Sequence, residues 1–411
     1  KNKLSGNEVI SGAKNAAVAV IPAAIMASDV CLIDNLPYIE DVKCLYTTLN
    51  KMGVEWEYND KHTLKIDSSA NFSTTVTFDE VRKMRASYYL IGALLARFKK
   101  AEVALPGGCN FGTRPIDLHL KGFRALGAEV EVKGEVVCVS ADKLKGTNIY
   151  MDTVSVGATI NIMLAATMAE GITTIENAAK EPHIVDVANF LNMMGANIKG
   201  AGTDVIKITG VDHLHGAEYT IIPDQIEAGT YMIAAAITGG CVKVSNIIPK
   251  HMDSLSAKLI EIGIGIEEGD DCIVVDARDR KFKATSVRTM AYPGFPTDLQ
   301  PQIAALLSVC EGTSMITENV WEKRYQYIDE LKRLGAKITV EGRVAIIEGV
   351  KELTGAEVEA TDLRAGAAMI IAALNARGET VIGEVKYIDR GYEEVEKKFS
   401  AIGADIKRVS V

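Results

Sequence analysis

The sequence is poor in the residues that build disulfide frameworks and metal sites. Its 411 residues include seven Cys and six His, with no C-x-x-C pair and no Cys/His cluster at zinc-binding spacing. An odd number of scattered Cys argues against a disulfide framework. We therefore expect no structural or catalytic metal, and a reducing, cytoplasmic compartment.

Basic charge and long hydrophobic runs are also scarce. Lys and Arg number 45 against 54 Asp and Glu, a net charge of −9, which argues against nucleic acid or an anionic membrane surface as the main partner. The longest apolar stretch near the start, 16–27, is interrupted by Pro22 and is too short to span a bilayer. Nothing in the sequence resembles a signal peptide. The composition, 48% apolar and 24% charged, is that of a globular protein.

An internal repeat is the most informative feature of the sequence. Leu or Phe, three further residues, a Gly and then a strand-like run recur six times at steps of 68 to 74 residues. A Gly in this setting suits a helix C-cap, where a left-handed residue is needed. The six glycines are Gly53, Gly127, Gly195, Gly263, Gly335 and Gly403.

A second recurring phrase precedes the first in every repeat. It is an apolar, small-residue helix followed by a short β-rich run. Because these helices lack a polar face, we expect them to be enclosed, with sheets outside them. Six units divide into two domains of three units each; a single six-unit solenoid is the alternative. The helices are expected at 16–27, 86–96, 157–169, 229–237, 302–309 and 365–376.

Polar residues gather just before these buried helices. If the helices of a domain run parallel, their N-termini converge and offer N–H groups to phosphate and carboxylate ligands. Capping alone accounts for Asp224 and Asp362. Lys14, Arg85 and Arg364 lie where a cation is unfavourable, so an anionic ligand is expected to compensate them. The other polar residues at these positions are Asn15, Ser155, Glu227 and Asp298.

The glycine-rich segment LPGGCNFGTRPIDLH at 105–119 is the sharpest local signal. Cys109 lies at its centre with Arg114 five residues on, and a thiol near cations gains thiolate character. Cys109 is therefore a candidate nucleophile or proton donor, and Asp298, after two prolines, a candidate general base. His119 follows the segment closely, but a lone His is more often structural, and we give it no chemical role.

These motifs resemble those of the UDP-N-acetylglucosamine 1-carboxyvinyltransferase family of enolpyruvyl transferases. The matching phrases run in the family's order over essentially the whole chain. The resemblance implies an α/β fold with two inside-out barrels, each of three βαβαββ units. It also implies domains at 14–222 and at 1–13 plus 223–411, with the active site in the cleft between them. The phrases are SGAKNA, KMRASYYLIGALLARF, LPGGCNFGTRPIDLH, VSVGATINIMLAATMAEG, IENAAKEPHIVD, FPTDLQPQ, ATDLRAGAA and IDRGYE.

The resemblance implies transfer of the enolpyruvyl group of phosphoenolpyruvate to the 3′-hydroxyl of UDP-N-acetylglucosamine, with release of phosphate and without a cofactor. Cys109 would protonate the methylene carbon, and Asp298 would be the base. Phosphoenolpyruvate would be held by Lys14, Arg114 and Arg390, with Asn15 and Arg324 close by and Arg364 in support. The UDP-sugar would be bound by Arg85, Arg114, Pro115, Ile116, Asp117, Leu118, Thr153, Val154, Ser155, Val156, Asp298 and Val320.

The sequence departs from the family pattern at two positions. Thr153 stands where some members have Lys, and Tyr387 stands where many have His.

A shikimate-type enolpyruvyl transferase shares the implied fold and donor, but its G-N-(A/S)-G-T phrase is absent. A non-catalytic UDP-sugar-binding paralogue is the other alternative. No protein partner is indicated.

Overall fold

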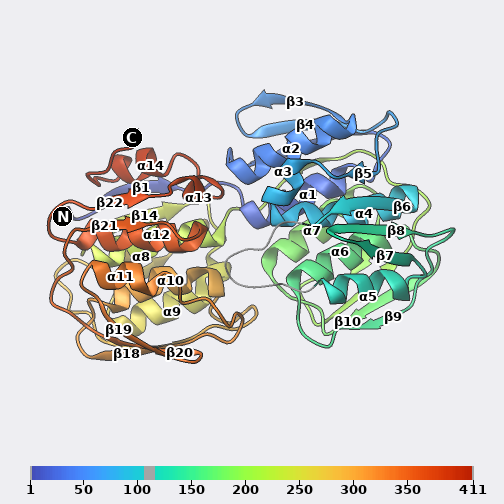
Figure 1. Cartoon of the computed structure of the whole chain (residues 1–411). Helices are drawn as coiled ribbons and strands as arrows, with labels where there is room; N and C mark the ends of the chain where they lie inside the picture. The colour runs from blue at the N-terminus through green and yellow to red at the C-terminus, as the bar shows by residue number, and fades with distance from the viewer. Residues whose placement is uncertain (1, 106–115, 410–411) are drawn as a thin grey trace. The chain divides into compact units, whose positions relative to one another are not determined.

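The structure is a computed structural model that describes residues 2–105 and 116–409. The chain divides into two compact units. Unit 1 comprises Lys1–Ser11 and Pro223–Val411, and unit 2 comprises Gly12–Ile222. Each unit is built from central helices with small sheets around them (Figure 1).

Three apolar helices form the centre of unit 2. They are α1 (Lys14–Ala24), α4 (Tyr89–Phe98) and α6 (Val156–Ala166), and nearly all their residues are buried. Helices that are apolar all round must be covered on every side, so the expectation of enclosed helices is confirmed. The remaining helices are α2 (Glu40–Met52), α3 (Asp79–Lys83), the 3₁₀ helix η1 (Arg85–Tyr88), α5 (Asp117–Ala125) and α7 (Pro182–Met193).

Three four-stranded sheets surround these helices. In each sheet one pair of neighbouring strands is parallel and the other two pairs are antiparallel. Their orders are β13-β2-β4-β3, β5-β6-β8-β7 and β11-β12-β10-β9. The strands are β2 (Val30–Asp34), β3 (Glu55–Asp60), β4 (Thr63–Asp67), β5 (Thr75–Val76), β6 (Lys100–Ala104), β7 (Glu129–Lys133), β8 (Val136–Ser140), β9 (Asn148–Tyr150), β10 (Ile172–Glu176), β11 (Asn197–Lys199), β12 (Val205–Thr209) and β13 (Glu218–Thr220).

Unit 1 repeats the plan around α8 (Gln225–Ile237), α10 (Gln300–Leu307) and α12 (Leu363–Asn375). Its sheets have the orders β1-β14-β16-β15, β17-β18-β20-β19 and β21-β22. The strands are β1 (Ser5–Val9), β14 (Cys241–Ser245), β15 (Gly265–Glu268), β16 (Cys272–Asp276), β17 (Ser286–Arg288), β18 (Thr313–Thr317), β19 (Lys337–Glu341), β20 (Val344–Glu348), β21 (Glu357–Glu359) and β22 (Val381–Gly383). The other helices are η2 (Pro249–Met252), α9 (Asp253–Ile262), η3 (Thr297–Leu299), α11 (Ile328–Arg333), α13 (Lys386–Asp389) and α14 (Val395–Ala401).

The six glycines of the repeat all adopt the left-handed conformation. Their φ angles lie between 92° and 108°, a region that a side chain with a Cβ rarely enters. Gly53 and Gly263 are the C-caps of α2 and α9. The expectation that this glycine ends a helix is therefore confirmed, and in the first five repeats a strand follows it.

The sixth repeat departs from the expected pattern. Two strands were expected after Gly403, but residues 404–409 form none, and the sheet β21-β22 has two strands in the described part of the chain. The sequence expectation was wrong at this point because it extended the pattern of five repeats to the sixth.

An asparagine clamp that the sequence analysis missed recurs in three repeats. The residue after β2, β10 and β14 is an Asn with φ near +60°. Its side-chain amide donates to a backbone carbonyl just beyond the neighbouring parallel strand. Asn tolerates this conformation better than most residues because its short side chain bonds locally. The pairs are Asn35 with Ile221 at 3.0 Å, Asn177 with Met151 at 2.8 Å and Asn246 with Ile10 at 2.7 Å.

A buried charge cluster fixes the end of the N-terminal segment of unit 1. The Lys398 ammonium lies 2.7 Å from the Glu227 carboxylate and 3.6 Å from that of Glu8. Ser11 is held at three points: its N–H donates to Glu227, its carbonyl accepts from the Asp224 N–H, and its hydroxyl accepts from Lys398. Burial raises the pKa of Glu8 to about 7, despite the attraction of Lys398. Two carboxylates therefore share one cation next to Ser11, after which the chain passes into unit 2.

Candidate active site

Helices α4, α5 and α6 of unit 2 point their N-termini in the same direction. Gly157, at the start of α6, lies against His119 near the start of α5 and against Tyr88 just before α4. Further along, Asn161 of α6 reaches Gly92 of α4. Contacts that advance together along two helices mean that the helices are parallel. The convergence expected from the sequence is thus present for two of the three central helices, α4 and α6.

Two of the predicted UDP-sugar segments occupy these converging ends. Residues 116–118 lead into and begin α5, and residues 153–156 lead into and begin α6. Ser155 is the N-cap of α6, and its hydroxyl accepts from the Ala158 N–H at 3.3 Å. Val154 is 43% exposed, and Asp117 is also exposed. Adjacent helix N-termini with accessible edges suit an anionic group such as a diphosphate.

Lys14 begins α1 and is paired with a residue that sequence reasoning missed. Its ammonium lies 2.9 Å from the carboxylate of Asp41, in the first turn of α2, and both side chains are largely buried. Asp41 is 27 residues from Lys14 and lies in a helix first turn, where acidic residues are common. The pair directs a cation to the N-terminal end of α1, where an anionic ligand is favoured.

In unit 1, Asp298 is held by two buried arginines. Arg324 donates to one carboxylate oxygen at 3.1 Å, and Arg364 donates to the other at 3.2 Å. Both arginines are 4% exposed, while the Asp298 side chain is 28% exposed. Charge-assisted hydrogen bonds on both oxygens fix the carboxylate while one edge stays accessible. The structure therefore brings together three of the predicted site residues.

Arg364 also anchors a buried polar network that the sequence did not indicate. It donates to the Tyr392 hydroxyl at 3.3 Å, which lies 2.9 Å from the Thr230 hydroxyl. Burial on its own lowers the pKa of Arg364, but Tyr392 and the carboxylates of Asp298 and Asp224 raise it overall. Arg364 is therefore a permanent cation at the N-terminus of α12.

The two aspartates that were read as caps are caps. The Asp224 carboxylate accepts from the N–H groups of Ile226 and Glu227 at the start of α8. The Asp362 carboxylate accepts from those of Arg364 and Ala365 at the start of α12. These bonds satisfy two of the N–H groups that a helix N-terminus leaves unpaired.

Glu318 organises the loops on either side of Asp298 and was not predicted. It is fully buried and accepts from the hydroxyls of Thr289 and Thr297 at 2.7 Å and 3.0 Å. It also accepts from the Val320 N–H at 2.8 Å. One carboxylate thus fixes the residue before Asp298 and the predicted UDP-sugar contact Val320, which is 38% exposed.

Arg390 follows α13 and is half-buried. The residue before it, Asp389, accepts two hydrogen bonds from Arg408 at 2.7 Å and 2.8 Å. Arg408 also contacts Glu396 of α14 at 3.1 Å. A bidentate pair of this kind fixes orientation as well as distance. The Asp389–Arg408 pair therefore restrains the backbone next to Arg390.

The predicted residues Cys109, Arg114 and Pro115 lie outside the described residues. Among the described cysteines, Cys31 and Cys310 are buried, which raises their thiol pKa values to about 11 and about 12. Such thiols are poor nucleophiles at neutral pH. Both side chains serve as small buried hydrophobic groups in this fold.

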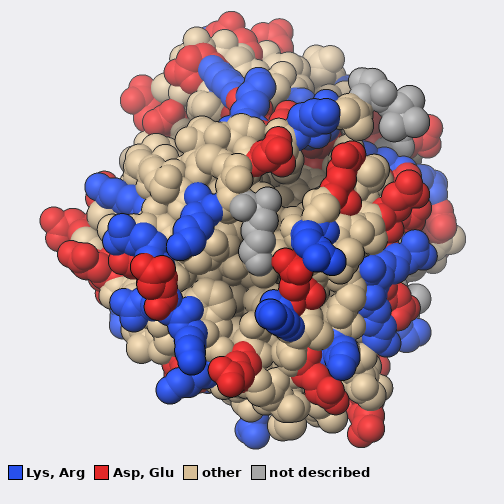
Figure 2. All heavy atoms as spheres, turned by 90° about the vertical axis from the view of Figure 1, so that its left-hand side faces the viewer, with Lys and Arg blue, Asp and Glu red and all other residues tan. Residues whose placement is uncertain are grey.

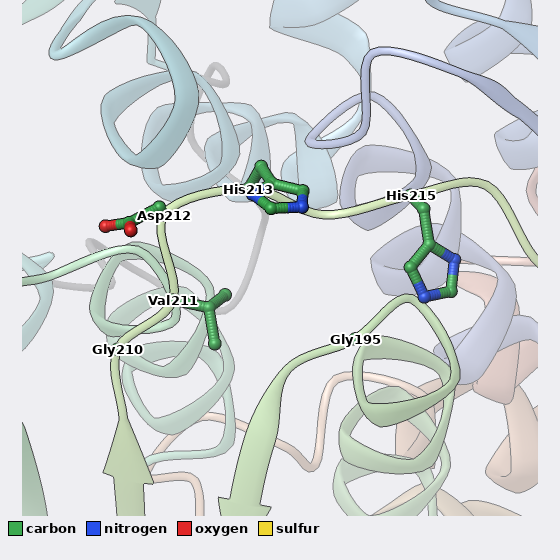
Figure 3. A pocket seen from close by; sticks show the side chains of 6 residues that line it. All are labelled: Gly195, Gly210, Val211, Asp212, His213 and His215. Atoms are coloured by element: carbon green, nitrogen blue, oxygen red, sulfur yellow. The ribbon is translucent and has the colours of Figure 1, made fainter.

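An open pocket in unit 2 lies between the end of α7 and the segment that follows β12 (Figure 3). It contains none of the predicted site residues. Elsewhere too, the residues that the structure describes include no group of three or more His, Cys, Asp or Glu arranged to hold a metal. The lining residues are Gly195, Gly210, Val211, Asp212, His213 and His215.

No helix in the described ranges is both long and apolar enough to cross a membrane. Lys and Arg side chains are interspersed with Asp and Glu on the face that Figure 2 shows.

The whole chain resembles proteins of known name. Residues 1–399 match the family described as EPSP synthase (3-phosphoshikimate 1-carboxyvinyltransferase). The UDP-N-acetylglucosamine 1-carboxyvinyltransferase of Clostridium botulinum is 59% identical over 99% of this chain and 98% of its own length. UDP-N-acetylglucosamine 1-carboxyvinyltransferase 2 of Clostridium acetobutylicum is 57% identical over 100% of this chain and 98% of its own length.

Solved structures agree with the fold. The enolpyruvyl transferase NikO from Streptomyces tendae superimposes with a TM-score of 0.90 at 26% identity, over 99% of this chain and 96% of its own. An EPSP synthase from Acinetobacter baumannii has a TM-score of 0.78 at 20% identity, over 100% of this chain and 98% of its own, which shows the fold alone. The expected enolpyruvyl transferase-like fold is thereby confirmed. The chain belongs to the EPSP synthase family of carboxyvinyltransferases and, within it, to the UDP-N-acetylglucosamine 1-carboxyvinyltransferases.

Proposed function

We propose that this chain is the enzyme that transfers the enolpyruvyl group of phosphoenolpyruvate to the 3′-hydroxyl of UDP-N-acetylglucosamine and releases phosphate. This reaction is the first committed step of peptidoglycan synthesis. The observation that carries the proposal is full-length similarity, at 57–59% identity, to proteins named for this activity. The charged residues described above give the proposal a chemical basis.

Phosphoenolpyruvate carries a phosphate and a carboxylate, so its site needs several fixed cations. We assign this role to Lys14, Arg114 and Arg390, with Asn15 nearby. The burial of Lys14 against Asp41 supports the assignment, because a cation fixed in a poorly hydrated setting acts strongly on an anion.

The chemistry needs an acid and a base with separate positions. Cys109 protonates the methylene carbon of phosphoenolpyruvate, while the 3′-hydroxyl adds to the neighbouring carbon and gives its proton to Asp298. The departing phosphate of the tetrahedral intermediate then takes the proton that Asp298 holds, and the freed carboxylate accepts a methyl proton. Exchange with solvent afterwards returns this proton from Asp298 to the Cys109 thiolate. The fixed carboxylate with one accessible edge supports this role for Asp298, and Arg324 and Arg364 hold it in place.

The UDP-sugar is assigned to Arg85, to residues 114–118 and 153–156, and to Val320. The parallel helices α5 and α6 begin at 116–118 and 153–156, and their N-termini support a site for the diphosphate there. Thr153 supplies no cation, so the diphosphate depends on backbone N–H groups and on Arg side chains. No metal or cofactor enters the proposed reaction. We place the protein in the cytoplasm, where both substrates would reach it, and assign it no nucleic-acid or membrane partner.

The test is release of inorganic phosphate from phosphoenolpyruvate, with and without UDP-N-acetylglucosamine, in the wild type and in Cys109→Ala. We expect release that requires the UDP-sugar and collapses in the variant. Release that requires shikimate 3-phosphate instead would identify the other branch of the family. Binding of UDP-N-acetylglucosamine without turnover would identify a non-catalytic paralogue.

A second experiment isolates the thiol. The epoxide fosfomycin should add once to the wild type and not to Cys109→Ala, as measured by intact mass spectrometry. Cys109→Asp should retain some turnover and escape the epoxide, because a carboxylic acid still donates a proton. An adduct on another cysteine, or a dead Cys109→Asp variant, would contradict the assignment of Cys109.

A further inference from the structure

Asn161 occupies an unusual position inside the helical core of unit 2. It is fully buried, and its side chain lies between the Tyr88 carbonyl and the Gly92 N–H. These two groups, four residues apart, are the pair that a regular helix bonds directly. The Asn161 amide donates to the first at 2.9 Å and accepts from the second at 2.9 Å. It therefore bridges η1 and α4 at the point where one becomes the other.

The same amide reaches a third element. Its nitrogen lies 3.0 Å from Nδ1 of His119, which is buried on α5. Because the Asn161 oxygen accepts from Gly92, the amide orientation is fixed and the nitrogen faces His119. An amide nitrogen only donates, so Nδ1 of His119 must accept. His119 is therefore neutral and carries its proton on Nε2.

Two glycines make room for this arrangement. A Cβ at Gly92 would lie 2.3 Å from the Asn161 oxygen. A Cβ at Gly157 would lie 2.8 Å from the Tyr88 hydroxyl and 3.2 Å from the His119 ring. The Tyr88 and His119 rings meet edge to face with centroids 4.8 Å apart. Close packing of this kind leaves each group one position.

The elements joined at Asn161 are those that carry the proposed UDP-sugar residues of unit 2. Tyr88 ends η1, which begins at Arg85, and His119 follows residues 116–118. Asn161 itself lies on α6, which residues 153–156 lead into and begin. We propose that Asn161, through neutral His119 and the Tyr88 carbonyl, is a positioning residue that fixes these three segments for UDP-N-acetylglucosamine. This inference rests on the proposed function.

The first test is Asn161→Ala. Removing the amide abolishes its bonds to the Tyr88 carbonyl, the Gly92 N–H and His119, so η1 and α5 can shift relative to α6. We expect KM for UDP-N-acetylglucosamine to rise about tenfold, which corresponds to about 1.4 kcal/mol. KM for phosphoenolpyruvate should stay within about twofold of the wild-type value, a much smaller change than the rise expected for the UDP-sugar. An unchanged KM for the UDP-sugar would overturn the proposal.

The matched control is Thr159→Ala on the same helix. Thr159 is equally buried, and its hydroxyl accepts from the Ala179 N–H at 3.1 Å, away from His119. This variant should lose thermal stability but keep the wild-type KM for the UDP-sugar. A matching rise in KM would mean that general loosening of α6, and not positioning by Asn161, produced the effect.

Two measurements address His119 directly. His119→Asn places an amide oxygen near the former Nδ1, so it should recover much of the UDP-sugar affinity that His119→Ala loses. Equal losses in both variants would contradict the hydrogen-bond argument. In ¹⁵N NMR, the His119 signals, assigned by their absence in His119→Asn, should report the Nε2–H tautomer at neutral pH. An imidazolium or Nδ1–H tautomer would overturn the proposal.

Calorimetric binding of UDP-N-acetylglucosamine separates this inference from the proposed function. Wild-type binding without phosphate release would refute the proposed turnover, while weaker binding by Asn161→Ala would still support positioning. Normal turnover with equal binding by both proteins would refute the positioning role alone.

Discussion

The Glu8–Glu227–Lys398 cluster predicts that one carboxylate limits stability at high pH. Glu227 is closer to Lys398 and also accepts from the Ser11 N–H, although burial raises its pKa as well. Burial raises the pKa of Glu8 to about 7. We expect Glu8→Gln, which keeps the shape and removes the charge, to be more stable than the wild type at alkaline pH.

The magnitude follows from the pKa of Glu8 in the two states. The folded value is about 7 and the reference value 4.5. The protonated carboxyl therefore stabilises the fold fully below pH 4.5, and this contribution is lost as the pH rises through about 7. Each pKa unit corresponds to about 1.4 kcal/mol, so the full change is about 3 kcal/mol. Glu8→Gln should equal the wild type near pH 4.5 and exceed it by about 3 kcal/mol above pH 8.

The two tryptophans allow each unit to be followed separately. Trp321 lies in unit 1 with Glu8, and Trp56 lies in unit 2. In a Trp56→Phe background, urea unfolding followed by fluorescence reports on unit 1 and should show the pH-dependent gain of Glu8→Gln. In a Trp321→Phe background the same substitution should leave the unfolding midpoint of unit 2 unchanged.

Two outcomes would refute this reasoning. A stability difference that is the same at pH 5 and pH 8.5 would mean that Glu8 does not titrate between them. A loss of stability in Glu8→Gln at pH 8.5 would mean that the attraction between Glu8 and Lys398 outweighs the cost of burying the charge.

Three further predictions concern other contacts. Asp41→Asn should lower the stability of unit 2 by about 2 kcal/mol, read from Trp56, because the buried Lys14 ammonium loses its carboxylate; an unchanged midpoint would show that solvent compensates Lys14. Arg364→Lys should lower kcat for phosphate release about tenfold or more, because one ammonium does not reproduce the planar contacts to Asp298 and Tyr392; a wild-type rate would remove Arg364 from the positioning of Asp298. Asn246→Ala should cost about 2 kcal/mol and Asn246→Gly about 1 kcal/mol in unit 1, since both lose a hydrogen bond but only Ala is strained at positive φ; equal urea midpoints for the two variants would contradict the strain argument.

Features that depend on local backbone geometry were predictable from the sequence. Gly53 and its five counterparts had to be left-handed because a helix ends there and the chain must turn. The apolar helices had to be enclosed because they have no polar face. Asp224 and Asp362 had to cap because they directly precede a helix.

Features that depend on distant partners were not predictable. Asn161 is 69 residues from Gly92, and although its helix was expected to be enclosed, nothing local indicates which groups its amide would bond. Asp41 reads as a first-turn acidic residue, and its pairing with Lys14 exists only once α1 and α2 pack. Glu318 follows a strand as any surface Glu might, and its four donors come from three separate places in unit 1. Tertiary packing assigned these roles.

The pairing of β13 with β2 gives unit 2 the connectivity of a closed ring. The last strand of the unit completes its first sheet, and the Ala13 N–H donates to the Ile222 carbonyl at 2.7 Å, so the two ends of the unit meet. On the other side of the crossovers, the Ser11 carbonyl accepts from the Asp224 N–H at 2.9 Å. Unit 2 is therefore an insertion in the sequence of unit 1, and the two ends of the insertion are adjacent. The strand pairing within unit 2 does not depend on which residue begins its chain. Circular permutants of unit 2 opened at a turn between repeats keep every strand pair, because a ring can be cut wherever no pairing is lost.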